Sequence, residues 1–240
     1  MKLQTSKFNL PSRKSLWQQV HDVLENMIIH REIAPGEKLI EQNLSDYFGV
    51  SRGPIREAIL ALQKDGWVDV QHNYGAFVKN PGRKEAAQLF EVRRILEAEA
   101  AVMAAKRITE NQLEQLKAII DKGIEAQASK DVDGSLALNT QFHRLVCEAS
   151  GNEVLARLME HVEKQVVWFL SAVVSFRGDV SWVEHERIFE ALSSGNDQLA
   201  GDLMSKHAQG TFLAYLSTND DQVAKSADIE SEAQDASESR

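Results

Sequence analysis

The stretch from residue 41 to residue 66 constrains the fold more than any other part of this 240-residue chain. A first short helix is expected from apolar residues at helical spacing, namely Leu44, Tyr47 and Phe48. Gly49 ends this helix as a glycine beyond a C-terminus does, and Ser51 is placed to cap a second helix. Two helices joined by so short a turn predict a helix-turn-helix, which places the start of its second helix in the DNA major groove.

A β-hairpin is expected directly after the second helix. Residues 67–71 and 76–79 are short runs of β-forming residues, and residues 72–75 between them have the composition of a turn. A hairpin in this place is the wing of a winged helix. The alternative, an ordinary helical hairpin without a DNA role, explains the two helices but leaves the wing unexplained.

These residues resemble the N-terminal winged-helix domain of GntR-family bacterial transcription regulators. The resemblance runs from residue 34 to residue 66 and is most specific in the segment Gly-Val-Ser-Arg-Gly-Pro-Ile-Arg-Glu-Ala of residues 49–58. It implies DNA contacts from the second helix and the wing tip, which here means Ser51, Arg52, Arg56, His72 and Asn73. Gln42, where some relatives carry an arginine, completes the candidate set. Arginine suits the role because its fork reaches guanine O6 and N7 together.

Composition indicates where such a domain works. Cys147 is the only cysteine, so an internal disulfide is excluded and a reducing cytoplasm is expected. The N-terminus has no apolar run typical of a secretion signal, and the most hydrophobic stretch, residues 166–176, is about half the length that spans a bilayer. We therefore expect a cytoplasmic protein without membrane contact. The net charge is −9, but residues 1–80 are nearly balanced, so DNA binding relies on a few placed cations and should weaken with salt.

The expected fold class is mainly α, with a winged helix-turn-helix followed by an all-α antiparallel bundle. Residues 1–13 are polar and predict a disordered arm, and residues 14–80 form the winged domain. Residues 81–217 show successive helical patterns with short connections and no strand-like alternation, which is typical of a bundle. Residues 218–240 are rich in Asp, Glu, Ser and Ala and predict an acidic disordered tail.

Three histidines lie on the apolar faces of three different expected helices: His143, His185 and His207. Because apolar faces point inward in a bundle, the three rings are expected to meet in its interior. Asn139 adds a polar group one turn before His143 on the same face. The simpler alternative is three separate core histidines, each satisfied by one hydrogen bond. Neutral imidazoles on facing helices are common ligands of zinc and similar ions, so we favour a shared centre.

The helical part resembles the FCD domain, the ligand-binding domain of the fatty-acid-regulator branch of the GntR family. The matching stretches are residues 91–97, 139–143, 150–152, 184–188 and 204–207. Many FCD domains hold a divalent metal, such as zinc or nickel, through an Asp and three His. The resemblance places these ligands at Asn139, His143, His185 and His207. Asn139 departs from the pattern because an amide brings no negative charge, which lowers the expected affinity for the metal.

The resemblance also implies a small carboxylate effector bound near the metal. Arg93 is the candidate to hold it, because a guanidinium forms two parallel hydrogen bonds with a carboxylate. The alternative is that Arg93 pairs along its own helix with Glu91 or Glu97, since residues three or four apart are neighbours on a helix.

We expect a sequence-specific transcription regulator, most commonly a repressor, that binds a palindromic operator as a homodimer. The first alternative is a DNA-binding protein whose helical domain only dimerises and senses no ligand. The second is a metal-dependent enzyme. Against the enzyme, the sequence offers no inward-facing carboxylate at a useful spacing for a general base and no nucleophile motif.

Overall fold

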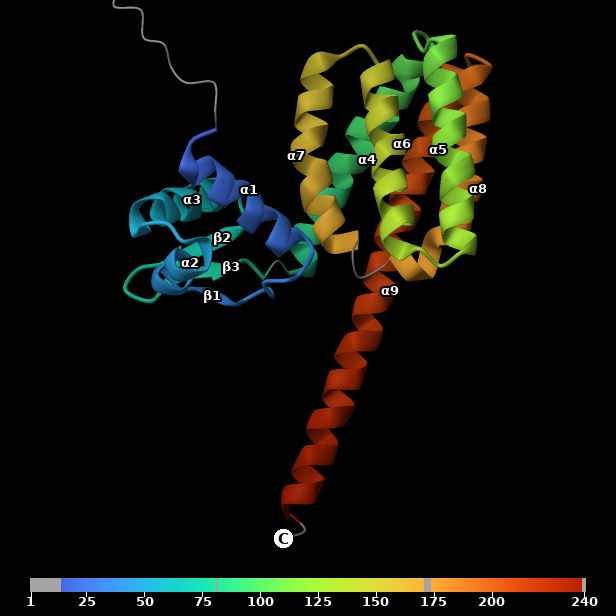
Figure 1. The fold of residues 1–240 in the computed structure, drawn as a ribbon. Coiled ribbons are helices and arrows are strands. Elements are labelled where there is room, and N and C mark those ends of the chain that lie inside the picture. Colours follow the sequence, from blue (N-terminus) through green and yellow to red (C-terminus); the bar gives the residue numbers. More distant parts are fainter. Residues whose placement is uncertain (1–13, 81, 171–173, 239–240) are drawn as a thin grey trace, which may run out of the picture. The chain divides into compact units, whose positions relative to one another are not determined.

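The computed structural model describes residues 14–80, 82–170 and 174–238, and it gives no side-chain detail for residues 170, 174–178 and 218–238. The chain divides into two compact units, Met1–Asn80 and Pro81–Arg240 (Figure 1). The predicted disordered arm, residues 1–13, lies outside the described residues. No helix in the described part of the chain is long and apolar enough to cross a membrane.

The first unit is a winged helix-turn-helix, as predicted. Its elements in order are α1 (Leu16–Ile29), β1 (Lys38–Leu39), α2 (Glu41–Phe48), α3 (Arg52–Lys64), β2 (Val68–Gln71) and β3 (Gly75–Val78). The three strands form an antiparallel sheet in the order β1-β3-β2. The hairpin β2–β3 is the expected wing, whereas the two-residue strand β1 was not predicted. Gly49 ends α2 in the left-handed conformation, with φ of 64°.

Apolar side chains of α1 and α3 and the first residue of the wing form the core of this unit. The largest fully buried side chains are Leu24, Ile28, Ile55, Leu62 and Trp67. Burying apolar side chains of this size contributes about 1.5–3 kcal/mol each, which is what holds so small a unit together. The core fixes the position of α3, and α3 carries two of the candidate DNA-reading residues, Arg52 and Arg56.

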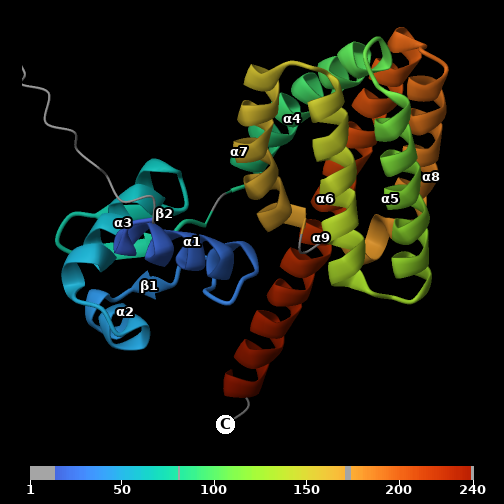
Figure 2. The same ribbon diagram turned by 45° about the horizontal axis from the view of Figure 1, so that its top comes forward.

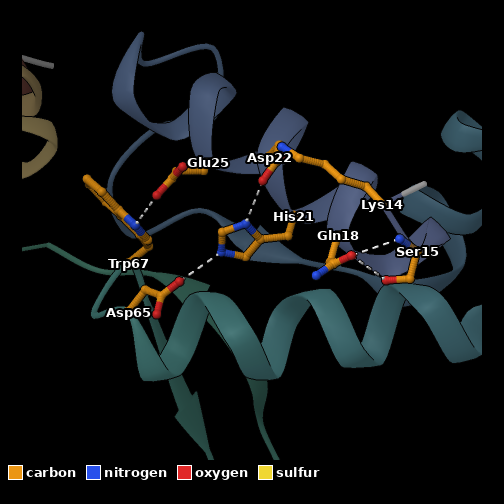
Figure 3. Close-up of polar contacts among 8 residues, drawn as sticks. All are labelled: Lys14, Ser15, Gln18, His21, Asp22, Glu25, Asp65 and Trp67. Carbon is orange, nitrogen blue, oxygen red and sulfur yellow. Dashed lines mark hydrogen bonds and ion pairs between the residues drawn. The ribbon is translucent and has the colours of Figure 1, made fainter. Parts of the chain in front are cut away.

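Two polar contacts connect α1 to the segment between α3 and β2 (Figure 3). The indole Nε1–H of Trp67 donates to Glu25 Oε1 at 3.1 Å, in a buried setting. The ring nitrogen Nε2 of His21 lies 2.9 Å from Asp65 Oδ2. These contacts fix the point where the chain leaves α3 and enters the wing.

The second unit is a bundle of helices, as predicted: α4 (Arg83–Ala105), α5 (Glu110–Ala128), α6 (Val132–Ala149), α7 (Glu153–Leu170), α8 (Val174–Ser193) and α9 (Asp197–Glu238). Figures 1 and 2 both show α7, α6 and α5 side by side. Helix α4 packs on α9, α6 and α7, while α8 packs on α5 and α9. Thr109 caps α5 with the expected capping box, in which its hydroxyl accepts from Gln112 N–H and the Gln112 side chain accepts from the Thr109 N–H.

Helix α9 continues to Glu238 and so includes residues that the composition predicts to be disordered. Ala, Glu, Gln and Lys have high helix propensity, which allows a helix here without a hydrophobic face. Composition does not predict this helix, because it indicates only that the segment has too few apolar residues for a core. It does not report the helix preference of the individual residues. The four predicted segments, residues 1–13, 14–80, 81–217 and 218–240, remain predictions in their boundaries.

Candidate metal centre and nucleic-acid interface

The rings of His143, His185 and His207 meet inside the bundle. They come from α6, α8 and α9 and are 4%, 0% and 2% exposed. The Nε2 atom of His207 lies 3.2 Å from Nε2 of His143 and 3.3 Å from Nε2 of His185. One nitrogen of each ring lies within 4.8 Å of the other two. Three apolar helix faces turned toward one core produce this convergence.

Two carboxylates lie behind these rings. Glu184 Oε2 is 2.7 Å from His207 Nδ1, and Glu97 Oε1 is 3.1 Å from His143 Nδ1. Each carboxylate contacts the ring nitrogen that points away from the centre. A carboxylate on the outer nitrogen fixes the tautomer and orientation of a metal-binding histidine and raises its basicity. The His207 ring therefore presents Nε2 as a lone-pair donor to the centre. His143 does so because Arg93 Nη2 lies within donating distance of its Nε2, whereas its Nδ1 forms no aligned hydrogen bond.

The protonation state of the centre suits a metal. Burial lowers the pKa of His207 to about 4, although its contact with Glu184 acts in the opposite direction. The ring is therefore neutral near pH 7 and keeps its lone pair. His207 Nε2 lies 3.2 Å from His143 Nε2 and 3.3 Å from His185 Nε2. A single ring N–H cannot satisfy both contacts, whereas one ion accepts all three lone pairs. The donor set fits zinc or nickel.

Arg93 lies at the same centre. It is 3% exposed on α4, its Nε–H donates to Glu97 Oε1 at 2.9 Å, and its Nη2 is 3.1 Å from His143 Nε2. Pairing with Glu97 is the expected alternative to an effector role, and that pairing is present. The guanidinium nevertheless keeps an unused donor, because Arg93 Nη1 is buried with no hydrogen-bond partner.

Glu97 is a buried carboxylate beside the centre. No inward-facing carboxylate was expected at a spacing useful for a general base, yet Glu97 is 2% exposed and lies beside His143. The reason is compensation: burial acts to raise the pKa of Glu97, but Arg93 and His143 outweigh it and hold that pKa well below its usual range. The only sequence indication was its position four residues after Arg93.

Asn139 is half-buried on α6, one turn before His143. Within the described bundle, its amide makes no hydrogen bond to the three histidines. A cavity of about 250 Å³ lies between α6 and α7 and reaches His143. Its walls include Arg144, Arg157 and Glu163, and the Glu163 Oε1 atom is buried without a partner. Burial raises the pKa of Glu163 despite the nearby Arg144.

The first unit carries the other candidate set, on the exposed side of α2 and α3. The Arg52 side chain is held by Gln42, whose Oε1 accepts from Arg52 Nε at 3.0 Å and also from Nη2. Gln42 Nε2 in turn donates to Asp46 Oδ1 at 2.7 Å. Gln42 thus positions Arg52, a role that its residue type alone did not indicate.

The remaining candidates separate into two places. Arg56 pairs with Glu41, with Nε 2.8 Å from both carboxylate oxygens. Ser51 precedes α3, but its hydroxyl makes no capping hydrogen bond. His72 and Asn73 are exposed at the turn of the wing, where Asn73 has a positive φ of 65°.

A winged-helix unit followed by a helical bundle with a buried polar centre defines the class of one-chain transcription regulators that carry a DNA-binding unit. Comparison with known families identifies the class further. Residues 16–78 match the family "Bacterial regulatory proteins, gntR family", and residues 88–210 match the FCD domain. The chain belongs to the GntR family of transcription regulators, in the branch with an FCD domain.

Individual relatives agree with this assignment. The chain is 31% identical to the transcriptional regulator LutR of Bacillus subtilis, over 81% of this chain and 95% of LutR. It is 28% identical to the transcriptional repressor RspR of Escherichia coli, over 80% and 85% of the two chains. A solved GntR-type regulator from Rhodococcus superposes with a TM-score of 0.72 at 25% identity, covering 85% of this chain and 99% of that one. The protein is thus a DNA-binding regulator and not an enzyme.

Proposed function

We propose that this regulator binds a palindromic operator as a homodimer in the cytoplasm, and that a small carboxylate held beside a zinc or nickel ion in the bundle controls it. The observation that carries the proposal is the convergence of three buried Nε2 atoms, two of them backed by carboxylates. We assign DNA binding to residues 14–80, and effector binding and dimerisation to residues 81–217.

The metal ligands in this proposal are His143, His185 and His207, with Asn139 able to offer a neutral amide oxygen. When bound, the ion supplies a positive charge to which a carboxylate can coordinate. Glu97 and Glu184 hold the rings in place, which reduces the reorganisation that ion binding requires.

The effector part of the proposal is supported by Arg93 and by the adjoining cavity. Arg93 has a donor without a partner at the centre, and the cavity of about 250 Å³ reaches the same histidine that Arg93 contacts. Arg144 and Arg157 line that cavity and can pair with an anion, while Glu148, Glu160 and Glu163 line it as well. A volume of this size admits a small acid.

The DNA part rests on the side chains exposed at the start of α3 and at the wing tip. Gln42, Ser51, Arg52, Arg56, His72 and Asn73 form the proposed set. Arg52→Ala should abolish specific operator binding, because it removes the fork that reads a guanine. Thermal stability should be unchanged, since the side chain is exposed. The measurement is fluorescence anisotropy with an operator selected from random duplexes; undiminished affinity would refute the role of Arg52.

Metal binding is tested by elemental analysis and thermal melting of stripped protein with added zinc or nickel. A ligand that binds only the folded state raises the melting temperature by mass action. We expect one ion per chain and a clear stabilisation, both lost in His185→Ala. His161→Ala is the matched control, because His161 is exposed on α7 and away from the centre. No metal in wild type, before or after soaking, would remove the ion from the proposal.

A further inference from the structure

We infer that Asp46 is a positioning residue for DNA recognition: through Gln42 it holds the guanidinium of Arg52 in the orientation that reads a guanine. The inference rests on the proposed DNA-reading role of Arg52 and names a further residue that determines its specificity. Asp46 and Gln42 lie on α2, and Arg52 is the first residue of α3, so the three side chains meet across the turn between the two helices.

The turn between α2 and α3 fixes the place from which the Arg52 side chain starts. Ser45 Oγ donates to the carbonyl oxygen of Val50 at 2.5 Å, and the Val50 N–H donates to the carbonyl oxygen of Ser45 at 3.2 Å. Gly49 between them has the left-handed φ of 64°. These contacts hold the start of α3 close to α2, so that a side chain of α2 reaches the Arg52 guanidinium.

The amide of Gln42 has a direction, and Asp46 sets it. Gln42 Nε2 donates to Asp46 Oδ1 at 2.7 Å, one turn further along α2. A carboxylate only accepts hydrogen bonds, so this contact takes the NH₂ end of the amide and turns its carbonyl end toward Arg52. Because a guanidinium only donates, the carbonyl end is the one that can hold it.

Gln42 occupies one edge of the Arg52 guanidinium and leaves another for a base. Its Oε1 accepts from Arg52 Nε at 3.0 Å and also from Nη2. The second hydrogen of Nη2 and both hydrogens of Nη1 lie along the end of the fork. Two parallel donors on this edge match O6 and N7 of guanine. An arginine that is held in advance loses less conformational freedom on binding, which favours the correct contact.

The residue that holds Arg52 is neutral, and this distinguishes Arg52 from Arg56. Arg56 Nε lies 2.8 Å from both oxygens of Glu41, so a carboxylate compensates the charge of Arg56. Gln42 orients Arg52 without compensating its charge, so the guanidinium keeps its attraction for the electronegative atoms of the base. Orientation and charge together assign base reading to Arg52.

The test compares Asp46→Leu with Asp46→Asn in the full chain. Both variants remove the same negative charge, but the asparagine keeps an oxygen that accepts from Gln42 Nε2, whereas the leucine does not. The probes are duplexes in which each base pair of a selected operator is replaced in turn, and fluorescence anisotropy at low salt gives each Kd. The base pair read by Arg52 is the one whose replacement weakens wild type by roughly 5–150-fold and leaves the Kd of Arg52→Ala unchanged.

We expect Asp46→Leu to lower the discrimination at this base pair by roughly 2–10-fold, the usual effect of one hydrogen bond, and Asp46→Asn to retain it. Discrimination at the other base pairs should be unchanged in both variants. Equal discrimination in Asp46→Leu and wild type would overturn the inference. If both variants instead tighten binding to every duplex by the same factor, Asp46 acts only as a charge that repels DNA, and the inference is overturned as well.

Gln42→Met shows whether the effect of Asp46 passes through Gln42. Methionine has a similar length, but its thioether is a weak acceptor and cannot donate to Asp46. We expect the same loss of discrimination as in Asp46→Leu, and no further loss in the double variant, because both changes break one chain of hydrogen bonds. Losses that add in the double variant would mean that Asp46 acts by another route, against the inference.

The inference and the proposed function fail in different ways. If Arg52→Ala keeps discrimination at every base pair, the DNA-reading role is wrong and the inference falls with it. If Arg52→Ala loses discrimination while Asp46→Leu and Gln42→Met keep it, Arg52 reads its base without support from α2, and the inference alone is overturned. All three side chains are exposed, so the melting temperature of each variant should match that of wild type.

Discussion

Glu97 shows how a buried charge is tolerated at the scale of single residues. It is 2% exposed, its Oε1 accepts from Arg93 Nε at 2.9 Å, and the same oxygen lies 3.1 Å from His143 Nδ1. Burial opposes ionisation, but the two neighbours keep the pKa of Glu97 well below its usual range, so it is a carboxylate at neutral pH. Its charge compensates the equally buried Arg93.

Glu97→Gln should therefore destabilise the bundle strongly. Removing one partner of a buried ion pair costs about 3–5 kcal/mol, because the other charge is left uncompensated. The measurement is urea unfolding of metal-free protein followed by circular dichroism. Glu91→Gln on the same helix is the control: Glu91 is exposed, so its change should stay within about 0.5 kcal/mol. Equal, small effects for both variants would show that the pair carries no stability.

Cys147 should be unreactive in the folded protein. It is 4% exposed, and burial together with Glu97 and Glu163 raises the pKa of its thiol far above the usual range. Since the thiolate is the reactive form, a disulfide reagent such as Ellman's should react slowly at pH 8 and stoichiometrically only after denaturation. The chain has one cysteine, so the colour change has a single source. Rapid labelling of native protein would contradict the buried position.

The part of the centre that could be predicted is the part that depends on helical spacing alone. The three histidines lie on apolar helix faces, and helical spacing alone turns such faces inward. Glu97 could not be placed in this way, because a charged residue enters a core only when it has partners there, and one of its partners, His143, comes from another helix. The role of Gln42 was missed for the same reason: it depends on Arg52, ten residues away in the chain.

At the scale of helices, α5 and α8 pack closely at Gly123. A Cβ atom at this position would overlap the Trp182 ring. The ring has little freedom to move, since its Nε1–H donates to Ser135 Oγ at 3.2 Å and it makes a T-shaped contact with His185, with centroids 4.9 Å apart. The absence of a side chain at Gly123 therefore allows α8, which carries His185, to pack close to α5.

Gly123→Ala should destabilise the bundle although alanine favours helices. Overpacking costs about 1–3 kcal/mol, which exceeds the gain of about 1 kcal/mol in helix propensity. Gly53→Ala in α3 is the control, because nothing lies within 4 Å of a Cβ there, and it should be neutral or stabilising. Urea unfolding measures both. Stabilisation by both variants would mean that Trp182 gives way easily.

The elements that were predicted are those with strong local patterns. The helix-turn-helix, the wing and the capping box at Thr109 each depend on neighbouring residues. Strand β1 was missed because two residues, Lys38 and Leu39, carry no pattern of their own and form a strand only by pairing with β3.

At the scale of the whole molecule, we propose that an ion and an acid bound in the helical unit change the DNA affinity of the winged-helix unit. Such a link is a difference in affinity between two states of the chain, and a ligand changes DNA binding only as far as it prefers one state.

The most direct measurement is the affinity of the full chain for its selected operator, with and without zinc plus acetate. We expect a change in Kd of roughly 5–150-fold, absent in His185→Ala and retained in His161→Ala. An unchanged Kd in wild type, under conditions where zinc is bound stoichiometrically, would show that the histidine centre does not control DNA binding and would contradict the account.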